Sequence, residues 1–378
     1  MGKHPHFTPE EFQQRVARLR ERLRAANVDV ALFEELESMA WLTGYGNSEN
    51  RWRCVAIPLE GDPFFLIRAL DAGPCRSHIW FDDVITFKDW EDPVKALADA
   101  LGARGLAKAR IGVNLGSYCL PPRRFEAIRA ALPGASFVDL GALVDELRLL
   151  KSPAEIALLR RSSAIADEAL RRAAAECVRG GSQRAAAKAA MAAFVDLGAD
   201  PDRPGPISRA RGWDFLHAHL EDGTLSEGDV VHLEIVPRVG GYSARVMRCA
   251  TVGTPPLELL RAAERLAELQ DRQIAALKPG AVAEEVDAIL RDGLVSAGLR
   301  TSVDNITGYT LGYYSHATPR TSDFTRIFCP GQRWRVEPNM VFHMYVSAGG
   351  ASFSETVLVT DAGPERLTKL PRGLIVNA

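Results

Sequence analysis

The chain has 378 residues, of which 25% are charged, and its formal net charge at neutral pH is -2. This length allows two domains with a substantial core, and the balanced charge predicts neither nucleic acid nor a membrane surface as a partner. The six cysteines form no CxxC pair, which argues against a disulfide framework or a structural zinc site and favours a reducing compartment. The start, MGKHPHFTPEEF, lacks the apolar segment of a signal peptide, and we expect a soluble cytoplasmic protein.

The first part of the chain alternates between amphipathic helices and short apolar strands. Thr8 is predicted to cap a helix that begins at Pro9. Helices are predicted within 8–28, 92–105 and 121–134, and strands within 29–34, 53–59, 63–69, 83–88 and 110–116. This alternation predicts an α/β domain.

The second part begins near residue 150 and contains two similar segments. Ser152 and Glu155 form the pattern of a capping box at the start of a long helix. The segments 158–198 and 259–298 each read as a long helix, a glycine-containing break and a second helix, followed by β-forming stretches. A duplication predicts a pseudo-two-fold sheet with helices on its outer face and a ligand site between the halves. The alternative is a chance similarity of helices rich in Ala, Arg and Leu.

Residues 228–249 read as two strands joined by a tight turn, and the first strand carries a carboxylate. The alternation of side chains places His232 and Glu234 on one face and Val231, Leu233 and Ile235 on the other. A carboxylate in the middle of a strand is costly to bury unless something pairs with it. Arg245 on the return strand lies opposite the region of Glu234, so the pattern allows a structural ion pair or a catalytic group.

Other polar and aromatic side chains lie on segments that are predicted to converge on the same cleft. They are His217, His219, Tyr309, His316, His343, Tyr345 and Ser347. His217 and His219 resemble a metal-binding pair, but no third ligand lies at short spacing, so the metal signal is weak. Each histidine alone is more typical of a structural residue; their convergence favours a functional site.

The chain is similar over nearly its whole length to the pita-bread family of methionine and Xaa-Pro aminopeptidases, creatinase and ectoine hydrolase. The motifs are SMAWLTGYG, ELRLLKSPAEIALLRRSSAIAD, LSEGDVVHLEI, GYSARVMRC, TGYTLGYYSHATP, VEPNMVFHMYV and FSETVLVTDAGPERLT. The resemblance implies a creatinase-like α/β domain over 1–149 and an α+β pita-bread catalytic domain over 150–378. It also implies a homodimer whose N-terminal domain reaches the partner's site, with Tyr45 and Trp52 as substrate contacts. Alternatively these aromatic residues pack only on their own domain.

The resemblance also places other side chains where the family holds two metal ions. The family's ligands are two aspartates, a histidine and two glutamates, and in that order this chain has Glu234, Arg245, Tyr309, Tyr345 and Ser354. Two divalent ions need several anionic or imidazole ligands, and a guanidinium among them would repel both ions. We therefore expect neither a metal nor another cofactor.

The histidines that face the substrate in this family are kept. His217 and His316 match these positions, which implies that they protonate the departing nitrogen while Glu234 acts as nucleophile or general base. The resemblance is strongest to ectoine hydrolase and its relatives; creatinase matches less well because it keeps a glutamate at Ser354. The implied substrate-binding residues are Arg245, Tyr309, His343, Tyr345, Ser354, Trp52 and Tyr45.

These features predict a metal-independent hydrolase of a non-peptide C–N bond, in an amidine, amide or ring. The substrate is expected to be a small polar or zwitterionic molecule derived from an amino acid. A non-hydrolytic lyase, cyclase or decarboxylase on the same scaffold is an alternative. A substrate-binding pseudoenzyme and a metal-dependent Xaa-Pro aminopeptidase are further ones.

Overall fold

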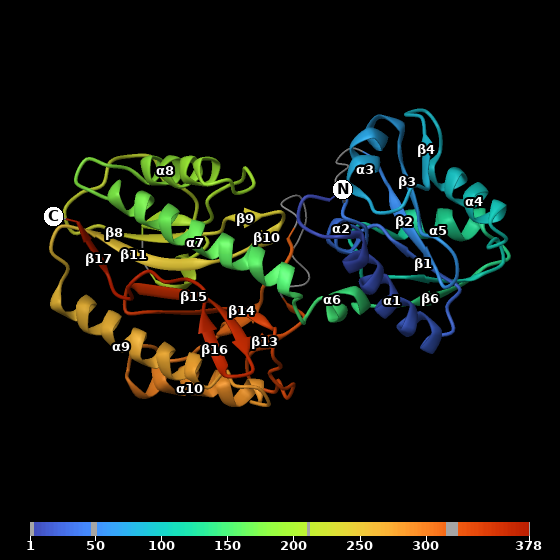
Figure 1. Cartoon of the computed structure of the whole chain (residues 1–378). Coiled ribbons are helices and arrows are strands. Elements are labelled where there is room, and N and C mark those ends of the chain that lie inside the picture. Colours follow the sequence, from blue (N-terminus) through green and yellow to red (C-terminus); the bar gives the residue numbers. More distant parts are fainter. Residues whose placement is uncertain (1–3, 47–50, 210–211, 315–323, 378) are drawn as a thin grey trace. The chain divides into compact units, whose positions relative to one another are not determined.

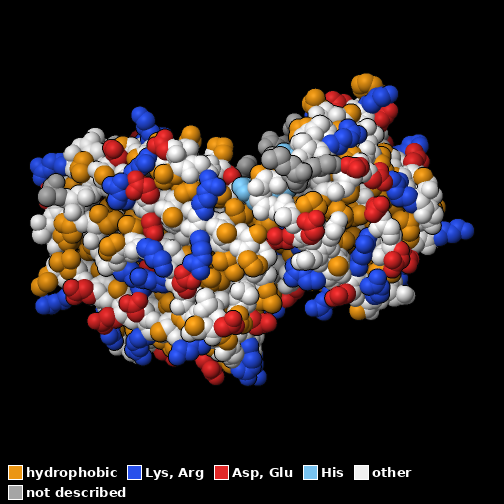
Figure 2. All heavy atoms as spheres, viewed as in Figure 1, with side chains coloured by type: hydrophobic (Ala, Val, Ile, Leu, Met, Phe, Trp, Pro, Cys, Tyr) orange, Lys and Arg blue, Asp and Glu red, His pale blue; other side chains and the backbone are white. Residues whose placement is uncertain are grey.

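The computed structural model describes residues 4–46, 51–209, 212–314 and 324–377. They fall into two compact units, the first ending at Arg148 and the second beginning at Leu149 (Figure 1). No helix within these ranges is long and apolar enough to cross a bilayer. Figure 2 shows acidic and basic side chains interspersed on the face in view, in agreement with the small net charge.

The first unit is built on a six-stranded sheet of order β4-β3-β2-β1-β5-β6, in which β1 runs antiparallel to β2 and parallel to β5. Its helices are α1 (Pro9–Ala25), α2 (Leu36–Thr43), the 3-10 turn η1 (Ala69–Asp71), α3 (Ala72–His78), α4 (Pro93–Ala103), α5 (Pro122–Ala131) and α6 (Leu143–Leu147). Its strands are β1 (Val30–Phe33), β2 (Cys54–Pro58), β3 (Phe64–Arg68), β4 (Val84–Phe87), β5 (Arg110–Val113) and β6 (Ser136–Asp139). The predicted α/β arrangement is confirmed.

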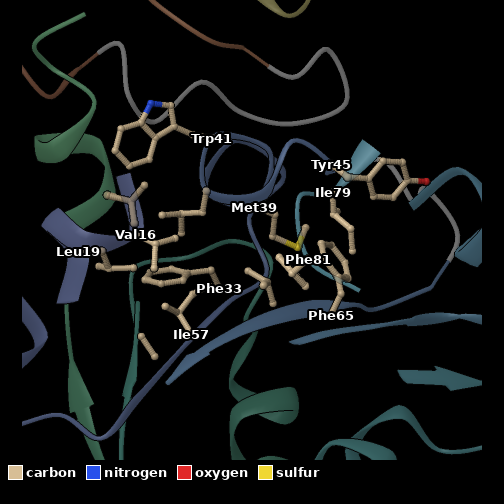
Figure 3. Packing of buried hydrophobic residues seen from close by; sticks show 14 of the residues in the cluster. Val16, Leu19, Phe33, Met39, Trp41, Tyr45, Ile57, Phe65, Ile79 and Phe81 are labelled. Carbon is tan, nitrogen blue, oxygen red and sulfur yellow. The ribbon is translucent and has the colours of Figure 1, made fainter. Parts of the chain in front are cut away.

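Helix α2 is one of the elements that the sequence pattern did not predict. All eight of its residues are buried, so it has no polar face and no amphipathic period to detect. Figure 3 shows Met39 and Trp41 of α2 packed with Val16 of α1 and with Phe33. Tyr45 lies at the edge of the same cluster, with its hydroxyl pointing away from the other labelled side chains.

Directly after β1, the first unit buries the carboxyl group of Glu34. Burial raises its pKa to about 8, while a hydrogen bond from Ser117 opposes this shift and the charge of Glu35 adds to it. Between pH 4.5, its ordinary pKa, and about 8 the folded chain therefore holds a proton that the unfolded chain has lost. The contribution of Glu34 to stability thus falls as the pH rises through this window and is constant above it.

We expect Glu34→Gln to remove this dependence. The variant should match the wild type near pH 4.5 and be more stable at pH 8 by about 4 kcal/mol, because glutamine loses no proton. Calorimetric melting of both proteins at several pH values measures the difference. Glu60→Gln, which changes a carboxyl group that is 81% exposed, is the control and should behave like the wild type. Parallel pH profiles for wild type and E34Q would contradict the assignment.

The second unit contains a curled sheet with the strand path β13-β12-β14-β15-β11-β8-β7; β16 is added beside β15 and β17 beside β11. Its helices are α7 (Pro153–Ala175), α8 (Gln183–Asp196), the 3-10 turn η2 (Trp213–Phe215), α9 (Leu257–Ala275) and α10 (Ala283–Ser296). Its strands are β7 (Ile207–Arg209), β8 (Val230–Ile235), β9 (Arg238–Val239), β10 (Tyr242–Ser243), β11 (Val246–Val252), β12 (Gly308–Thr310), β13 (Ile327–Phe328), β14 (Val341–Ala348), β15 (Ala351–Thr360), β16 (Gly363–Arg366) and β17 (Ile375–Asn377).

The two similar segments of the sequence form two helix pairs that flank this sheet (Figure 1). Helix α7 packs on α8 and on β8 and β11, whereas α9 packs on α10 and on β14 and β15. The predicted capping box is present, with Ser152 and Glu155 bonded reciprocally. The pita-bread architecture that the sequence predicted is confirmed.

The connection between β8 and β11 differs from the simple hairpin that the sequence suggested. Along the chain, β8 is followed by a small two-stranded ribbon of β9 and β10 before β11 begins. The ribbon turns at Gly240 and Gly241, whose φ angles are 56° and 81°. A side chain at Gly241 would meet the ring of Tyr313 at 2.2 Å. Glycine is required there by both backbone conformation and space.

Candidate active site

The face of the curled sheet that is turned away from the helices carries polar side chains in rows across neighbouring strands. The first row consists of Glu234, Met247, Ser354 and Tyr345, which lie opposite one another on β8, β11, β15 and β14. The second row consists of Arg245, Thr356, His343 and Tyr309, in which Thr356 bonds to the backbone of Arg245 and pairs with His343. Residues directly opposite each other in antiparallel strands point to the same face of the sheet, so the members of each row share a face. The two rows are neighbours on that face, because their residues lie two positions apart along the strands.

Six of these eight residues line the wall of a cavity of about 450 Å³. Its lining residues are Trp213, Asp214, Leu216, His217, Glu234, Arg245, Met247, Asn305, Ile306, Tyr309, Phe324, His343 and Tyr345. The volume suits a small molecule. Six of the predicted site residues therefore share one cavity, namely His217, Glu234, Arg245, Tyr309, His343 and Tyr345.

Glu234 and Arg245 form an ion pair in the wall of this cavity. Arg245 Nη1 lies 3.4 Å from Glu234 Oε1, and the two side chains are 3% and 4% exposed. The same nitrogen donates a hydrogen bond to the hydroxyl of Tyr309, and the guanidinium carbon lies 5.3 Å from the centre of that ring. The ion pair that the sequence allowed is thus present, and it faces the space that a ligand would fill.

His343 lies between two tyrosines and has no hydrogen-bond partner among the described residues. Its ring stacks on Tyr345, with centroids 5.3 Å apart, and meets the edge of Tyr309 at 5.0 Å. Burial lowers its pKa well below 6.5, and the charges of Arg245 and His217 lower it further. The ring is therefore neutral at neutral pH and offers one donor and one acceptor. Since an unbonded buried polar atom is costly, the ring is well suited to a polar ligand group.

Tyr345 is held by a short chain of hydrogen bonds. Asn305 Nδ2 donates to its hydroxyl over 3.3 Å, and Arg300 Nη1 donates to Asn305 Oδ1 over 2.7 Å. The Arg300 guanidinium also lies 4.3 Å above the ring of Trp213. Burial raises the pKa of Tyr345, so its hydroxyl stays protonated and can donate to a ligand.

The remaining predicted residues lie elsewhere. Ser354 is fully buried between Met247 and Tyr345, outside the cavity lining, and its hydroxyl has no described partner. Tyr45 and Trp52 belong to the first unit, where Trp52 lies under the guanidinium of Arg124 at 5.1 Å. His316 lies outside the described residues.

The sequence missed several residues of the cavity. Asn305 stands two residues before the start of the motif TGYTLGYY, and a polar residue at that point was a usable signal. Trp213 precedes His217 in WDFLH, where an aromatic residue close to a candidate catalytic histidine was a second signal. Phe324 is 66% exposed and carries no pattern that would mark it.

Both parts of the chain match known families. Residues 15–150 match the creatinase/prolidase N-terminal domain, and residues 157–361 match metallopeptidase family M24. Ectoine hydrolase from Halomonas elongata is 27% identical over 98% of each chain. Xaa-Pro dipeptidase from Pyrococcus furiosus is 27% identical over 63% of this chain and 68% of its own.

Solved structures share the fold. A prolidase from Thermococcus sibiricus superposes with a TM-score of 0.84 at 22% identity, over 97% of this chain and 99% of that one. A dipeptidase from Pyrococcus horikoshii OT3 superposes with a TM-score of 0.81 at 24% identity, over 96% of this chain and 100% of that one. The chain is an enzyme of the M24 hydrolase family and carries the creatinase/prolidase N-terminal domain of its two-domain members.

Proposed function

We propose that this protein hydrolyses a non-peptide C–N bond in a small polar molecule derived from an amino acid, without a metal ion. The observation that carries the proposal is the Glu234–Arg245 ion pair in the cavity wall. It occupies two of the positions at which the family resemblance places metal ligands. The similarity to ectoine hydrolase over the whole chain supports the same class of reaction.

The side chains of the cavity do not fit the metal centre that the family name implies. Glu234 is the carboxylate among the five corresponding residues, and the guanidinium of Arg245 lies against it. A protonated phenol is not an anionic metal ligand, and this applies to Tyr309 as long as it is protonated. Burial keeps Tyr345 protonated. Among the residues that the structure describes, no cluster of three or more His, Cys, Asp or Glu side chains could hold a metal ion.

The geometry supports a reaction in which the carboxylate of Glu234 is the nucleophile or the general base. One carboxylate oxygen attacks the carbon of the amide or amidine, the C–N bond breaks, and the nitrogen leaves with a proton from His217. Water then attacks the same carbon of the resulting mixed anhydride (an acyl imidate if the substrate is an amidine), gives a proton back to His217 and releases Glu234 as a carboxylate. Alternatively, Glu234 removes a proton from the water that attacks the same carbon. His343 and Tyr345 supply neutral hydrogen-bonding groups that position the substrate.

Chelation is the sharpest test of metal independence. We expect the purified protein to contain less than stoichiometric transition metal and to keep its activity in EDTA, since no step is assigned to a metal. Incubation with cyclic amidines, linear amidines and Xaa-Pro dipeptides, followed by mass spectrometry, identifies the substrate by the gain of one water. A metal-dependent prolidase treated in parallel should lose its activity. Loss of activity in EDTA that added metal restores would refute the proposal.

We further propose a cytoplasmic homodimer in which Tyr45 and Trp52 contact the substrate of the partner. All six cysteines are free, which agrees with a reducing compartment. Light scattering determines the oligomeric state. If a Trp52→Ala variant keeps both dimerisation and kcat/KM, Trp52 has no role at the site.

A further inference from the structure

A second, much smaller chamber lies next to the cavity. Its free volume is about 10 Å³, and its polar lining comes from His232, Ser208, Ser347 and Ser352. Leu216 lines both this chamber and the main cavity, so the two spaces share a wall. The polar residues belong to a third row across the sheet, in which Ser208 pairs with His232 and Ser347 pairs with Ser352.

The ring of His232 in this chamber has incomplete hydrogen bonding. Its ring is 1% exposed, and Nδ1 lies 2.7 Å from the hydroxyl oxygen of Ser352. Nε2 is buried and has no hydrogen-bond partner among the described residues. Burial lowers the pKa of His232 to about 4, the charge of Glu234 opposes this shift, and His217 adds to it. The ring is therefore neutral at neutral pH.

The size and polarity of the chamber match one water molecule. A free volume of about 10–15 Å³ admits one water, which needs two to four polar partners. His232 Nε2 and the hydroxyls of Ser347 and Ser352 are such partners. Without a water, Nε2 would stay unbonded in a buried place, which is unfavourable by about 1–3 kcal/mol.

We propose that this chamber holds one buried water on His232 Nε2 and that this water supplies the hydrolytic step at Glu234. His232 lies two residues before Glu234 on the same face of β8, and the shared wall at Leu216 separates its water from the substrate. Once the C–N bond has broken, the water passes Leu216 into the main cavity and bonds to the carbon at which it broke. The bond between this carbon and Glu234 then breaks, and the proton of the water passes to His217. His232 is thus a positioning residue that touches the water rather than the substrate. The attack of this water on the substrate rests on the proposed hydrolysis, whereas the presence of the water in the chamber does not.

A high-resolution crystal structure tests the water site without any substrate. We expect density about 2.7–3.2 Å from His232 Nε2 and from one of the two serine hydroxyls. His232→Phe should remove this water because it keeps the ring and removes the nitrogen. The matched control is Cys249→Ala: Cys249 Sγ lies 3.3 Å from the Ser352 hydroxyl in the same row, outside the chamber lining. An empty chamber in the wild type would overturn the proposal.

Kinetics test the supply of the water, with a substrate found in the mass-spectrometric screen. We expect kcat of H232F to fall about 10²-fold, His232→Gln to recover part of it, and C249A to keep it. Substrate binding should not change, as measured by calorimetry on E234Q and on the E234Q/H232F double variant. Weaker binding in the double variant, or an equal fall of kcat in C249A, would assign His232 a structural role only. If no compound is hydrolysed, the proposed function fails, and the density at Nε2 still decides the water site.

Discussion

Replacement of Glu234 by glutamine is expected to lower kcat by about 10⁴-fold, at the upper end of the effect of a positioned acid–base group. Glutamine keeps the size of the side chain and can still accept a hydrogen bond from Arg245 Nη1, which lies 3.4 Å away in the wild type. It cannot attack as an anion or remove a proton from water. Steady-state turnover of the identified substrate, compared with the melting temperature, measures the effect separately from folding.

Asp214 offers the matched control, because it is a second acidic residue in the lining of the cavity and lies outside the two rows. Asp214→Asn should change kcat by no more than a few-fold. An E234Q protein that melts like the wild type and retains its turnover would remove Glu234 from the mechanism. Equal losses in both variants would indicate that the cavity needs negative charge in general rather than this carboxylate.

The largest effect on stability is expected at the ion pair between Arg248 and Glu355. Arg248 Nη2 lies 2.8 Å from Glu355 Oε1, and both side chains are completely buried. Arg248 also donates to the carbonyl oxygens of Pro371 and Leu370, so it holds the chain after β16 against the sheet. Arg248→Met or Glu355→Gln should each destabilise the second unit by about 3–5 kcal/mol. Glutamine leaves the buried Arg248 without its anion, and methionine leaves the buried Glu355 with only the more distant Arg372 (3.6 Å) and Arg366 (3.8 Å). Calorimetric melting measures this.

Two further variants give that experiment its controls. Arg160→Met breaks the ion pair between Arg160 and Glu365, which are 47% and 33% exposed. It should lower the free energy of unfolding by less than about 1 kcal/mol. The double variant Arg248→Met/Glu355→Gln should cost less than the sum of its two single changes, since it removes both charges together. Single variants that melt no lower than R160M would refute the assignment.

The alternation of side chains allowed much of the site to be predicted. Glu234 and His232 on β8, and His343 and Tyr345 on β14, were placed on one face by the period of two, and the structure has them there. The rows themselves could not be predicted. They depend on the pairing of β11 with β15, in which Met247 lies opposite Ser354, and nothing local in either strand sets that register.

Elements without a period were the ones missed in the first unit. Helix α2 is buried on all sides, and strand β6 lies at the edge of its sheet with half-buried and exposed residues, so neither shows the contrast on which periodicity depends. The ribbon of β9 and β10 was missed because its strands are two residues long. The helix pairs were predicted correctly because their amphipathic faces are long and because serines cap α7 and α8.

Strand β15 pairs with β14 on one side and with β11 on the other, and so it connects the two halves of the sheet. During biosynthesis, a chain released before Ala351 already contains Glu234, Arg245 and Tyr345 but lacks the strand that brings them together. Until then the ribosome-bound protein presents two open sheet edges, which invite pairing with other chains. We therefore expect nonsense truncations before this strand to yield insoluble, inactive product, and slow elongation near the end of the message to increase the demand for chaperones.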